Sequence, residues 1–162
     1  MNIRVCALVN DSVVDGPGLR YAVFTQGCAH SCAGCHNPQS HDPREGFDVS
    51  ADDILREIKK NPLLDGLTVS GGEPLDQLDA VTELVTLAKA QGLNVMLYTG
   101  YLWESFASET KYAPLLQNLD LCADGPFIEE KRDLDLVFLG SSNQRLIDVK
   151  KSLLQNGVVL YS

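Results

Sequence analysis

Short apolar segments that alternate with amphipathic ones are the feature that most constrains the fold of this chain. Residues 66–70 (GLTVS) and 94–100 (NVMLYTG) have the composition of buried β-strands. Between them, apolar residues recur at helical spacing and end before Gly92, at Leu78, Val81, Leu84, Val85 and Ala88. A strand, a helix and a second strand in this order predict a βαβ unit with parallel strands and a right-handed crossover.

The same alternation extends over most of the chain. Further strands are expected at residues 3–9, 20–26, 119–125, 145–150 and 158–162. Helices are expected at residues 51–61 and, as shorter pieces, at 103–108 and 112–116. Ser50 and Asp53 have the spacing of a capping box at the start of the longest of these helices, and Asn61 with Pro62 ends it. The sequence therefore predicts an α/β fold.

The length of the chain limits how far such a sheet can close. A complete eightfold β/α barrel seldom takes fewer than about 200 residues, and this chain has 162. We therefore expect a partial, open barrel of about five to six mostly parallel strands, formed by residues 1–162 as a single domain. Ligands of such sheets bind beyond the carboxyl ends of the strands.

Charge and composition exclude several classes of function. The formal net charge of −9 and the absence of a basic block disfavour direct binding of nucleic acid. No apolar run reaches the roughly 18 residues of a membrane span, and the first ten residues do not resemble a signal peptide. We therefore expect a cytoplasmic protein without a membrane partner.

Three of the five cysteines, Cys28, Cys32 and Cys35, lie within eight positions. An odd number of cysteines without an export signal makes a disulfide framework a poor explanation. Structural zinc normally recruits four ligands, and an electron-carrying [4Fe-4S] cluster normally has four cysteines. Three thiolates on a four-iron cube leave one iron open, as a catalytic site requires. The alternative is a zinc site completed by one of the other candidate ligands, which are His30, His36, His41, Cys6 and Cys122.

The segment SGGEP follows the strand predicted at residues 66–70. Gly71 and Gly72 allow a ligand to approach the backbone, and Pro74 biases Glu73 toward an extended conformation. Exposed carbonyl groups together with the Glu73 carboxylate suit an ammonium group. The alternative is a strand-to-helix turn that carries a solvated glutamate.

Taken together, the cysteine spacing and the GGEP motif resemble the radical S-adenosylmethionine superfamily. Three stretches are further similar to the activating proteins of anaerobic ribonucleoside-triphosphate reductases, which generate glycyl radicals. These stretches are VDGPGLRYAVFTQGCAHSCAGCHNPQS (14–40), YTGY (98–101) and ADGPFIEEKRDLDLVFLGSSNQRLIDV (123–149). The resemblance covers most of residues 10–150 and implies the radical S-adenosylmethionine type of partial barrel.

The resemblance also implies the chemistry and the partners. Cys28, Cys32 and Cys35 would hold a [4Fe-4S] cluster that binds S-adenosylmethionine, and residues 71–73 would hold the methionine ammonium group. Reduction would split S-adenosylmethionine into methionine and a 5′-deoxyadenosyl radical. That radical would take a hydrogen from a glycine near the C-terminus of the reductase large subunit. A low-potential donor such as reduced flavodoxin would supply the electron.

Further contacts to the cofactor are expected from loop residues. The family often places an aromatic residue just before the third cysteine, near the adenine, but here that residue is Gly34. His36 is therefore the candidate adenine neighbour, and an ordinary loop histidine is its alternative. Thr99 and Gly100 follow the strand NVMLY and are candidates for contact with the ribose or methionine part, although a tight turn would also use them. The resemblance also places residues 140–145 at the mouth of the site, with a solvated connecting loop as the alternative.

Two other functions compete with this interpretation. An activase of another glycyl radical enzyme, such as pyruvate formate-lyase, would share the chemistry and differ in its partner. A zinc-stabilised binding module without catalysis belongs to a different class. The absence of a ferredoxin-like insertion with extra cysteines favours a minimal activase, and the segment GSSNQRLID favours the reductase as its partner.

Overall fold

The computed structural model describes residues 1–30, 32–35 and 38–162. Its strands are β1 (Asn2–Ser12), β2 (Arg20–Thr25), β3 (Phe47–Ser50), β4 (Gly66–Gly71), β5 (Asn94–Tyr98), β6 (Leu121–Asp124) and β7 (Arg145–Asp148). Its α-helices are α1 (Ala51–Lys59), α2 (Leu78–Ala90), α3 (Trp103–Phe106), α4 (Ala113–Leu116) and α5 (Val149–Gln155). Four short 3-10 helices are η1 (Pro38–Ser40), η2 (Pro74–Gln77), η3 (Thr110–Tyr112) and η4 (Glu129–Lys131). Within the described residues, no helix combines the length and apolar character needed to cross a membrane.

The strands form one open sheet in the order β3-β1-β2-β4-β5-β6-β7. The pairings β2 with β4, β4 with β5 and β5 with β6 are parallel. The flanking pairings β3 with β1, β1 with β2 and β6 with β7 are antiparallel. The expected α/β fold and open sheet are therefore confirmed, but the expectation of five to six mostly parallel strands is wrong. The short turn between β1 and β2 leaves no room for the crossover helix that a parallel pair needs, so these strands form a hairpin.

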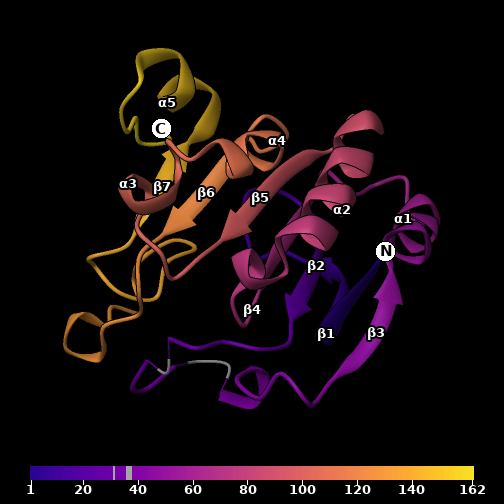
Figure 1. The fold of residues 1–162 in the computed structure, drawn as a ribbon, viewed down its shortest axis with the longest axis horizontal. Coiled ribbons are helices and arrows are strands. Elements are labelled where there is room, and N and C mark those ends of the chain that lie inside the picture. Colours follow the sequence, from indigo (N-terminus) through magenta and orange to yellow (C-terminus); the bar gives the residue numbers. More distant parts are fainter. Residues whose placement is uncertain (31, 36–37) are drawn as a thin grey trace.

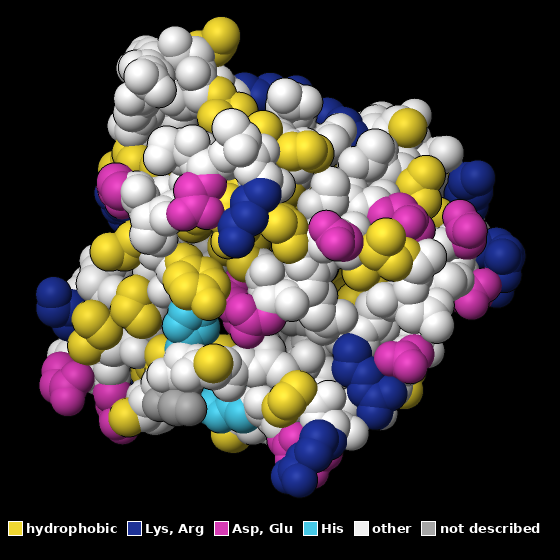
Figure 2. Space-filling view, viewed as in Figure 1, with side chains coloured by type: hydrophobic (Ala, Val, Ile, Leu, Met, Phe, Trp, Pro, Cys, Tyr) yellow, Lys and Arg dark blue, Asp and Glu magenta, His cyan; other side chains and the backbone are white. Residues whose placement is uncertain are grey.

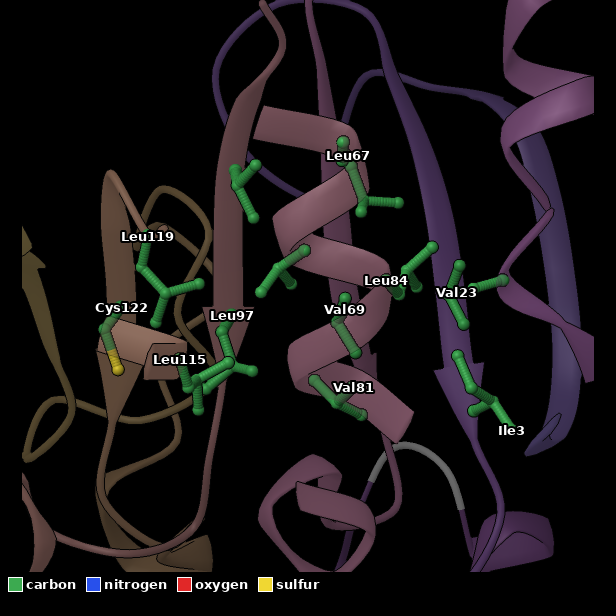
Figure 3. Packing of buried hydrophobic residues seen from close by; sticks show 14 of the residues in the cluster. Ile3, Val23, Leu67, Val69, Val81, Leu84, Leu97, Leu115, Leu119 and Cys122 are labelled. Carbon is green, nitrogen blue, oxygen red and sulfur yellow. The ribbon is translucent and has the colours of Figure 1, made fainter. Parts of the chain in front are cut away.

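The larger core lies between the sheet and the helices α1, α2 and α4. Figure 3 shows Val81 and Leu84 of α2 among the side chains of Val23, Leu67 and Val69 from β2 and β4. All five side chains have no exposed surface. The opposite face of the sheet carries a smaller buried cluster of Met96, Leu121 and Ala123, which is covered in part by Phe138 and Leu139 from the segment between β6 and β7.

Some of the predicted helix and strand boundaries are confirmed and others are wrong. The Ser50 hydroxyl accepts a hydrogen bond from the Asp53 amide at 3.1 Å, which confirms the predicted start of α1. The strand predicted at residues 145–150 stops at Asp148, whose carboxylate caps α5 by accepting from the Lys151 amide at 3.0 Å. The strand predicted at residues 158–162 is wrong, since only an isolated bridge joins Leu160 to β7. Strand β3 was not predicted.

Asp120, just before β6, joins three elements and gives the fold a dependence on pH. Its carboxylate accepts hydrogen bonds from Lys89 Nζ at 2.7 Å and from the Val95 amide at 2.8 Å, and Lys150 Nζ lies 3.3 Å away. Burial raises the pKa of Asp120, but the hydrogen bonds from Lys89 and Val95 outweigh burial, so the pKa is lowered. Its stabilising effect is therefore complete above the unfolded pKa of about 3.9 and is lost as the pH falls through the folded pKa.

We expect Asp120→Asn to lower the free energy of unfolding at neutral pH by about 1–3 kcal/mol, because charge-assisted hydrogen bonds are removed. The difference between the variant and the parent should begin to shrink near the unfolded pKa of about 3.9 and disappear once the pH falls below the lowered pKa of the folded Asp120, where the parent carboxylate is protonated as well. Urea unfolding across a pH series measures both effects. The exposed Asp11→Asn substitution on β1 is the matched control. A constant difference between Asp120→Asn and the parent down to pH 2 would contradict the role given to this carboxylate.

Candidate active site

The carboxyl ends of the parallel strands bring the predicted motifs to one edge of the sheet. Figure 1 shows the arrowheads of β2, β5 and β6 pointing to the same edge, along which the chain after β2 runs. In the register of β2 with β4, Thr25 lies opposite Gly71. The loop that carries the cysteines therefore begins directly beside the GGEP turn.

The cysteine loop is closed at its base by backbone hydrogen bonds. The Gly27 amide donates to the Ser40 carbonyl at 2.6 Å, and the Cys28 amide donates to the His41 carbonyl at 3.1 Å. Since these bonds tie the two ends of the loop together, the cysteines are carried on a closed turn of chain.

All three cysteines of this loop line one cavity of about 430 Å³. Its walls also include four of the predicted strand-end residues, Gly71, Gly72, Thr99 and Gly100, whereas the predicted Glu73 is not part of the lining. His36 lies outside the described residues. Cys6 is on β1 and Cys122 is buried in the core, where burial raises the pKa of its thiol. The sheet thus brings the cysteine loop and both strand-end loops to the same cavity.

The two glycines of the GGEP turn also have a packing role. A Cβ atom at Gly72 would lie 2.3 Å from the Gly27 carbonyl oxygen, and one at Gly71, where φ is +100°, would lie 2.3 Å from the Thr25 amide nitrogen. The Gly72 amide donates to the Thr25 carbonyl at 2.7 Å, and the Glu73 amide donates to the Gly27 carbonyl at 2.8 Å. Glycine is therefore required for the turn to lie against the base of the cysteine loop.

The carboxylate of Glu73 is fully buried and joins three loops. It accepts hydrogen bonds from Thr99 Oγ1 at 2.9 Å, from the Gly100 amide at 2.7 Å and from the Leu75 amide at 3.0 Å. His30 Nε2 lies 2.6 Å from the same carboxylate. The alternative of a solvated glutamate is therefore wrong. Contact between this carboxylate and a ligand stays a prediction, since Glu73 is buried behind the residues that line the cavity.

His30 is a site residue whose bond to Glu73 the sequence did not predict, since the expectation was a zinc ligand or a solvent-facing or structural histidine. Its ring meets the Tyr101 ring edge to face, with centroids 4.6 Å apart. A Cβ at Gly100 would lie 2.7 Å from His30 Cδ2, so the ring packs closely against this loop. The hydrogen bond to Glu73 raises the pKa of His30, and burial opposes this effect. The available signal was a histidine between two cysteines, on the same sheet edge as a glutamate that follows a buried strand.

A second part of the cavity wall comes from the segment between β6 and β7. It contributes the apolar side chains Phe127, Leu134, Leu136, Phe138 and Leu139. Gly140 and Gln144 also line the cavity, which agrees with the expectation that residues 140–145 border the site. The site therefore has a polar half, formed by the cysteine loop and strand ends, and an apolar half.

Among the described residues, no three His, Cys, Asp or Glu side chains are grouped closely enough to hold a single metal ion. A four-iron cube makes a different demand, because each thiolate binds a different iron atom and the sulfur atoms do not converge on one point. Three thiols spread around one cavity fit this demand.

The surface on the helical side carries no extended basic patch. Figure 2 shows acidic and basic side chains interspersed over this face, with histidine side chains on its lower part. This distribution agrees with the net charge of −9.

The comparisons with known proteins agree with this site. The family model of the 4Fe-4S single cluster domain matches residues 14–147. The match assigns the chain to the single-cluster iron–sulfur class and confirms the predicted iron–sulfur cofactor. The "Anaerobic ribonucleoside-triphosphate reductase-activating protein" of Haemophilus influenzae is 34% identical over 142 residues, which cover 82% of this chain and 89% of the relative. The chain belongs to the family of these activating proteins.

Other relatives show how far the similarity extends. The protein of the same name from enterobacteria phage T4 is 32% identical over 139 residues, which cover 82% of this chain and 86% of the relative. The "Pyruvate formate-lyase-activating enzyme" of Listeria monocytogenes serovar 1/2a is 43% identical over 99 residues, but these cover only 58% of this chain and 40% of the relative. The similarity to the reductase activators therefore spans more of both chains.

Proposed function

We propose that this protein is a radical S-adenosylmethionine enzyme that installs a glycyl radical on an anaerobic ribonucleoside-triphosphate reductase. It cleaves S-adenosylmethionine reductively to methionine and a 5′-deoxyadenosyl radical. That radical then takes a hydrogen from a glycine near the C-terminus of the reductase large subunit. The observation that carries this proposal is that the three cysteines and both strand-end loops line one cavity. Membership of the activator family supports the same function.

Cys28, Cys32 and Cys35 are the proposed ligands of the cluster. They are three thiols on one closed loop, and they face one cavity without converging as a single-ion site among the described residues. When bound, the cluster supplies the electron for cleavage and an open iron position for S-adenosylmethionine.

The strand ends are proposed to hold the methionine part of S-adenosylmethionine. Because Gly71 and Gly72 have no side chains, they offer the cavity only backbone groups. The Gly72 amide already donates to Thr25, so its carbonyl is the polar group left for an ammonium. Thr99 and Gly100 line the cavity beside this turn, and His36 remains the proposed adenine neighbour.

The buried carboxylate of Glu73 is proposed to orient the site as well as to favour a cation. Its hydrogen bonds hold the cysteine loop through His30 and the β5 loop through Thr99 and Gly100. Together with the GGEP turn that carries Glu73, these two loops form the polar half of the cavity, so the carboxylate fixes the spacing of its walls. Such preorganisation matters because the sulfonium must be held close to the source of the electron.

The open sheet suits a substrate that is itself a protein. We propose that residues 1–162 act as one domain with the partial barrel of the radical S-adenosylmethionine type, and that its open side admits the glycine-bearing segment of the partner. We further propose that the protein works in the cytoplasm with a low-potential donor such as reduced flavodoxin.

Activation of pyruvate formate-lyase is the second candidate, favoured by the 43% identity to the Listeria enzyme over 99 residues. To separate the two, the reconstituted protein is incubated anaerobically with S-adenosylmethionine, dithionite and each purified partner. Electron paramagnetic resonance then reports the glycyl radical. We expect the radical signal on the reductase. A signal only on the formate-lyase would make the proposed partner wrong, and no signal on either would refute the activase function.

A further inference from the structure

The apolar half of the cavity has no role in the function proposed so far. It is formed by the segment between β6 and β7, which lies beyond the sheet edge at the lower left of Figure 1. The base of this segment is held by hydrogen bonds within the segment itself. Gln144 Oε1 accepts from the Gly140 and Ser141 amides at 2.9 and 3.2 Å, and Gln144 Nε2 donates to the Gly125 carbonyl at 3.0 Å. The Gln144 side chain therefore fixes the base of the segment.

The tip of the segment, residues 134–139, is held differently. Among the described residues, one hydrogen bond joins this tip to a strand, from the Tyr98 hydroxyl to the Phe138 carbonyl at 2.7 Å. Phe138 has a φ of +67°, a left-handed conformation that costs energy for a bulky residue and needs support from its surroundings. Phe138 and Leu139 also pack against Met96 and Leu121 on the open face of the sheet.

Tyr98 is well placed to connect the two halves of the cavity. It ends β5, lines the cavity, and directly precedes Thr99, whose hydroxyl bonds to Glu73. Burial raises the pKa of the Tyr98 phenol, so the hydroxyl keeps its proton and remains a donor. Two adjacent residues at the end of β5 therefore bind opposite halves of the cavity. Thr99 bonds to Glu73 in the polar half, and Tyr98 bonds to Phe138 in the apolar half.

The tip presents apolar side chains both to the cavity and to solvent. Leu136 lines the cavity, and Leu134 and Val137 are 80% and 68% exposed. A small molecule inside the cavity could contact its apolar lining, but it would leave the exposed Leu134 and Val137 in solvent. A polypeptide that runs from the surface into the cavity can cover the exposed side chains and the lining together while its backbone passes the cysteine side of the same cavity.

We propose that residues 134–139 are the docking surface for the glycine-bearing segment of the polypeptide substrate, and that Tyr98 is the positioning residue that holds this surface in place. The inference rests on the proposed function, because it names how that site receives its protein substrate. It assigns to Tyr98 a part in substrate binding and none in the reaction itself.

The test uses Tyr98→Phe, which keeps the ring and removes the hydroxyl. Radical formation on the reductase is measured by electron paramagnetic resonance at increasing reductase concentration. We expect the half-saturating reductase concentration to rise about five- to tenfold, the effect of one lost hydrogen bond, with the maximal rate within about twofold. Tyr112→Phe is the matched control, because Tyr112 packs in the helical core away from the cavity. An unchanged half-saturating concentration, or a loss confined to the maximal rate, would overturn the proposal.

A second pair of variants tests the surface itself. Leu134→Ser should raise the half-saturating concentration by a similar factor, whereas Leu154→Ser should not. Leu154 lies on α5 and is 86% exposed, so the two variants are matched in chemistry and exposure. Equal effects of the two would overturn the docking surface.

Amide hydrogen exchange tests the hydrogen bond between Tyr98 and Phe138 without any partner protein. In Tyr98→Phe the amides of residues 134–139 should exchange at least about fivefold faster, and those of α2 should be unchanged. Unchanged exchange at the tip would overturn the positioning role of Tyr98. If the unmodified protein forms no radical on any partner, the proposed function fails, and this exchange experiment still decides the role of Tyr98.

Discussion

Replacing Cys32 by alanine should remove the iron–sulfur cluster and stop production of 5′-deoxyadenosine. Cys32 lines the same cavity as Cys28 and Cys35, and two thiolates cannot replace three on a cube that already leaves one iron open. We expect the loss of activity to exceed the roughly 10²–10³-fold cost of removing one transition-state contact, because the electron source itself is lost. Iron content, visible absorption and chromatography of the products after anaerobic reconstitution measure the effect.

Cys6→Ala is the control for this substitution. Cys6 lies on β1, away from the cavity, so its variant should keep its iron and its activity. Retention of both by Cys32→Ala would contradict the assignment of the cysteine loop. Stoichiometric zinc without iron in the unmodified protein would instead restore the binding-module hypothesis.

Replacing Glu73 by alanine should impair both stability and cofactor binding. The substitution leaves the Gly100 and Leu75 amides, the Thr99 hydroxyl and the His30 ring without their shared acceptor in a buried place. Removing one partner of such a network typically costs about 3–5 kcal/mol. We expect the free energy of unfolding to fall by roughly that amount and binding of S-adenosylmethionine to weaken by at least about tenfold.

Two further variants separate the roles of Glu73. Glu73→Gln keeps the shape and one acceptor oxygen, so it should retain most of the stability, while the loss of charge still weakens binding of a cation. Glu57→Ala removes an exposed carboxylate on α1 that pairs with Lys60, and it should change stability by less than about 0.5 kcal/mol. If the folded Glu73→Ala protein bound S-adenosylmethionine as tightly as the parent does, the proposed role of this carboxylate in cofactor binding would be wrong.

The sequence allowed much of the site to be predicted because its signals are local. The spacing of Cys28, Cys32 and Cys35 and the glycines before Glu73 are visible in the letters, and the strand-end rule for parallel sheets brings them together. The cap at Ser50 is equally local, and it is confirmed. These predictions depend only on residues within a few positions of one another.

Predictions that depended on distant contacts were the ones that failed. The buried Glu73 carboxylate needs hydrogen-bond donors from three different loops. The segment GGEP by itself gives no indication of these donors. Apolar residues at 158–162 suggested a strand, but this segment meets β7 only at the isolated bridge of Leu160 with Ile147. The apolar residues of the tip that contains Phe138 do not recur at the spacing of a strand or a helix. The position of this tip depends on Tyr98, forty residues earlier in the chain, so it could not be predicted from the local sequence.

The most direct test of the central claim follows one hydrogen atom. The reductase large subunit is prepared with glycine deuterated at Cα, and the activated mixture is analysed for 5′-deoxyadenosine by mass spectrometry and for the radical by electron paramagnetic resonance. The account predicts one deuterium in 5′-deoxyadenosine for each radical formed, and a narrowed signal from the remaining deuterium at the radical carbon. Formation of 5′-deoxyadenosine without deuterium, and without a radical on the reductase, would contradict it.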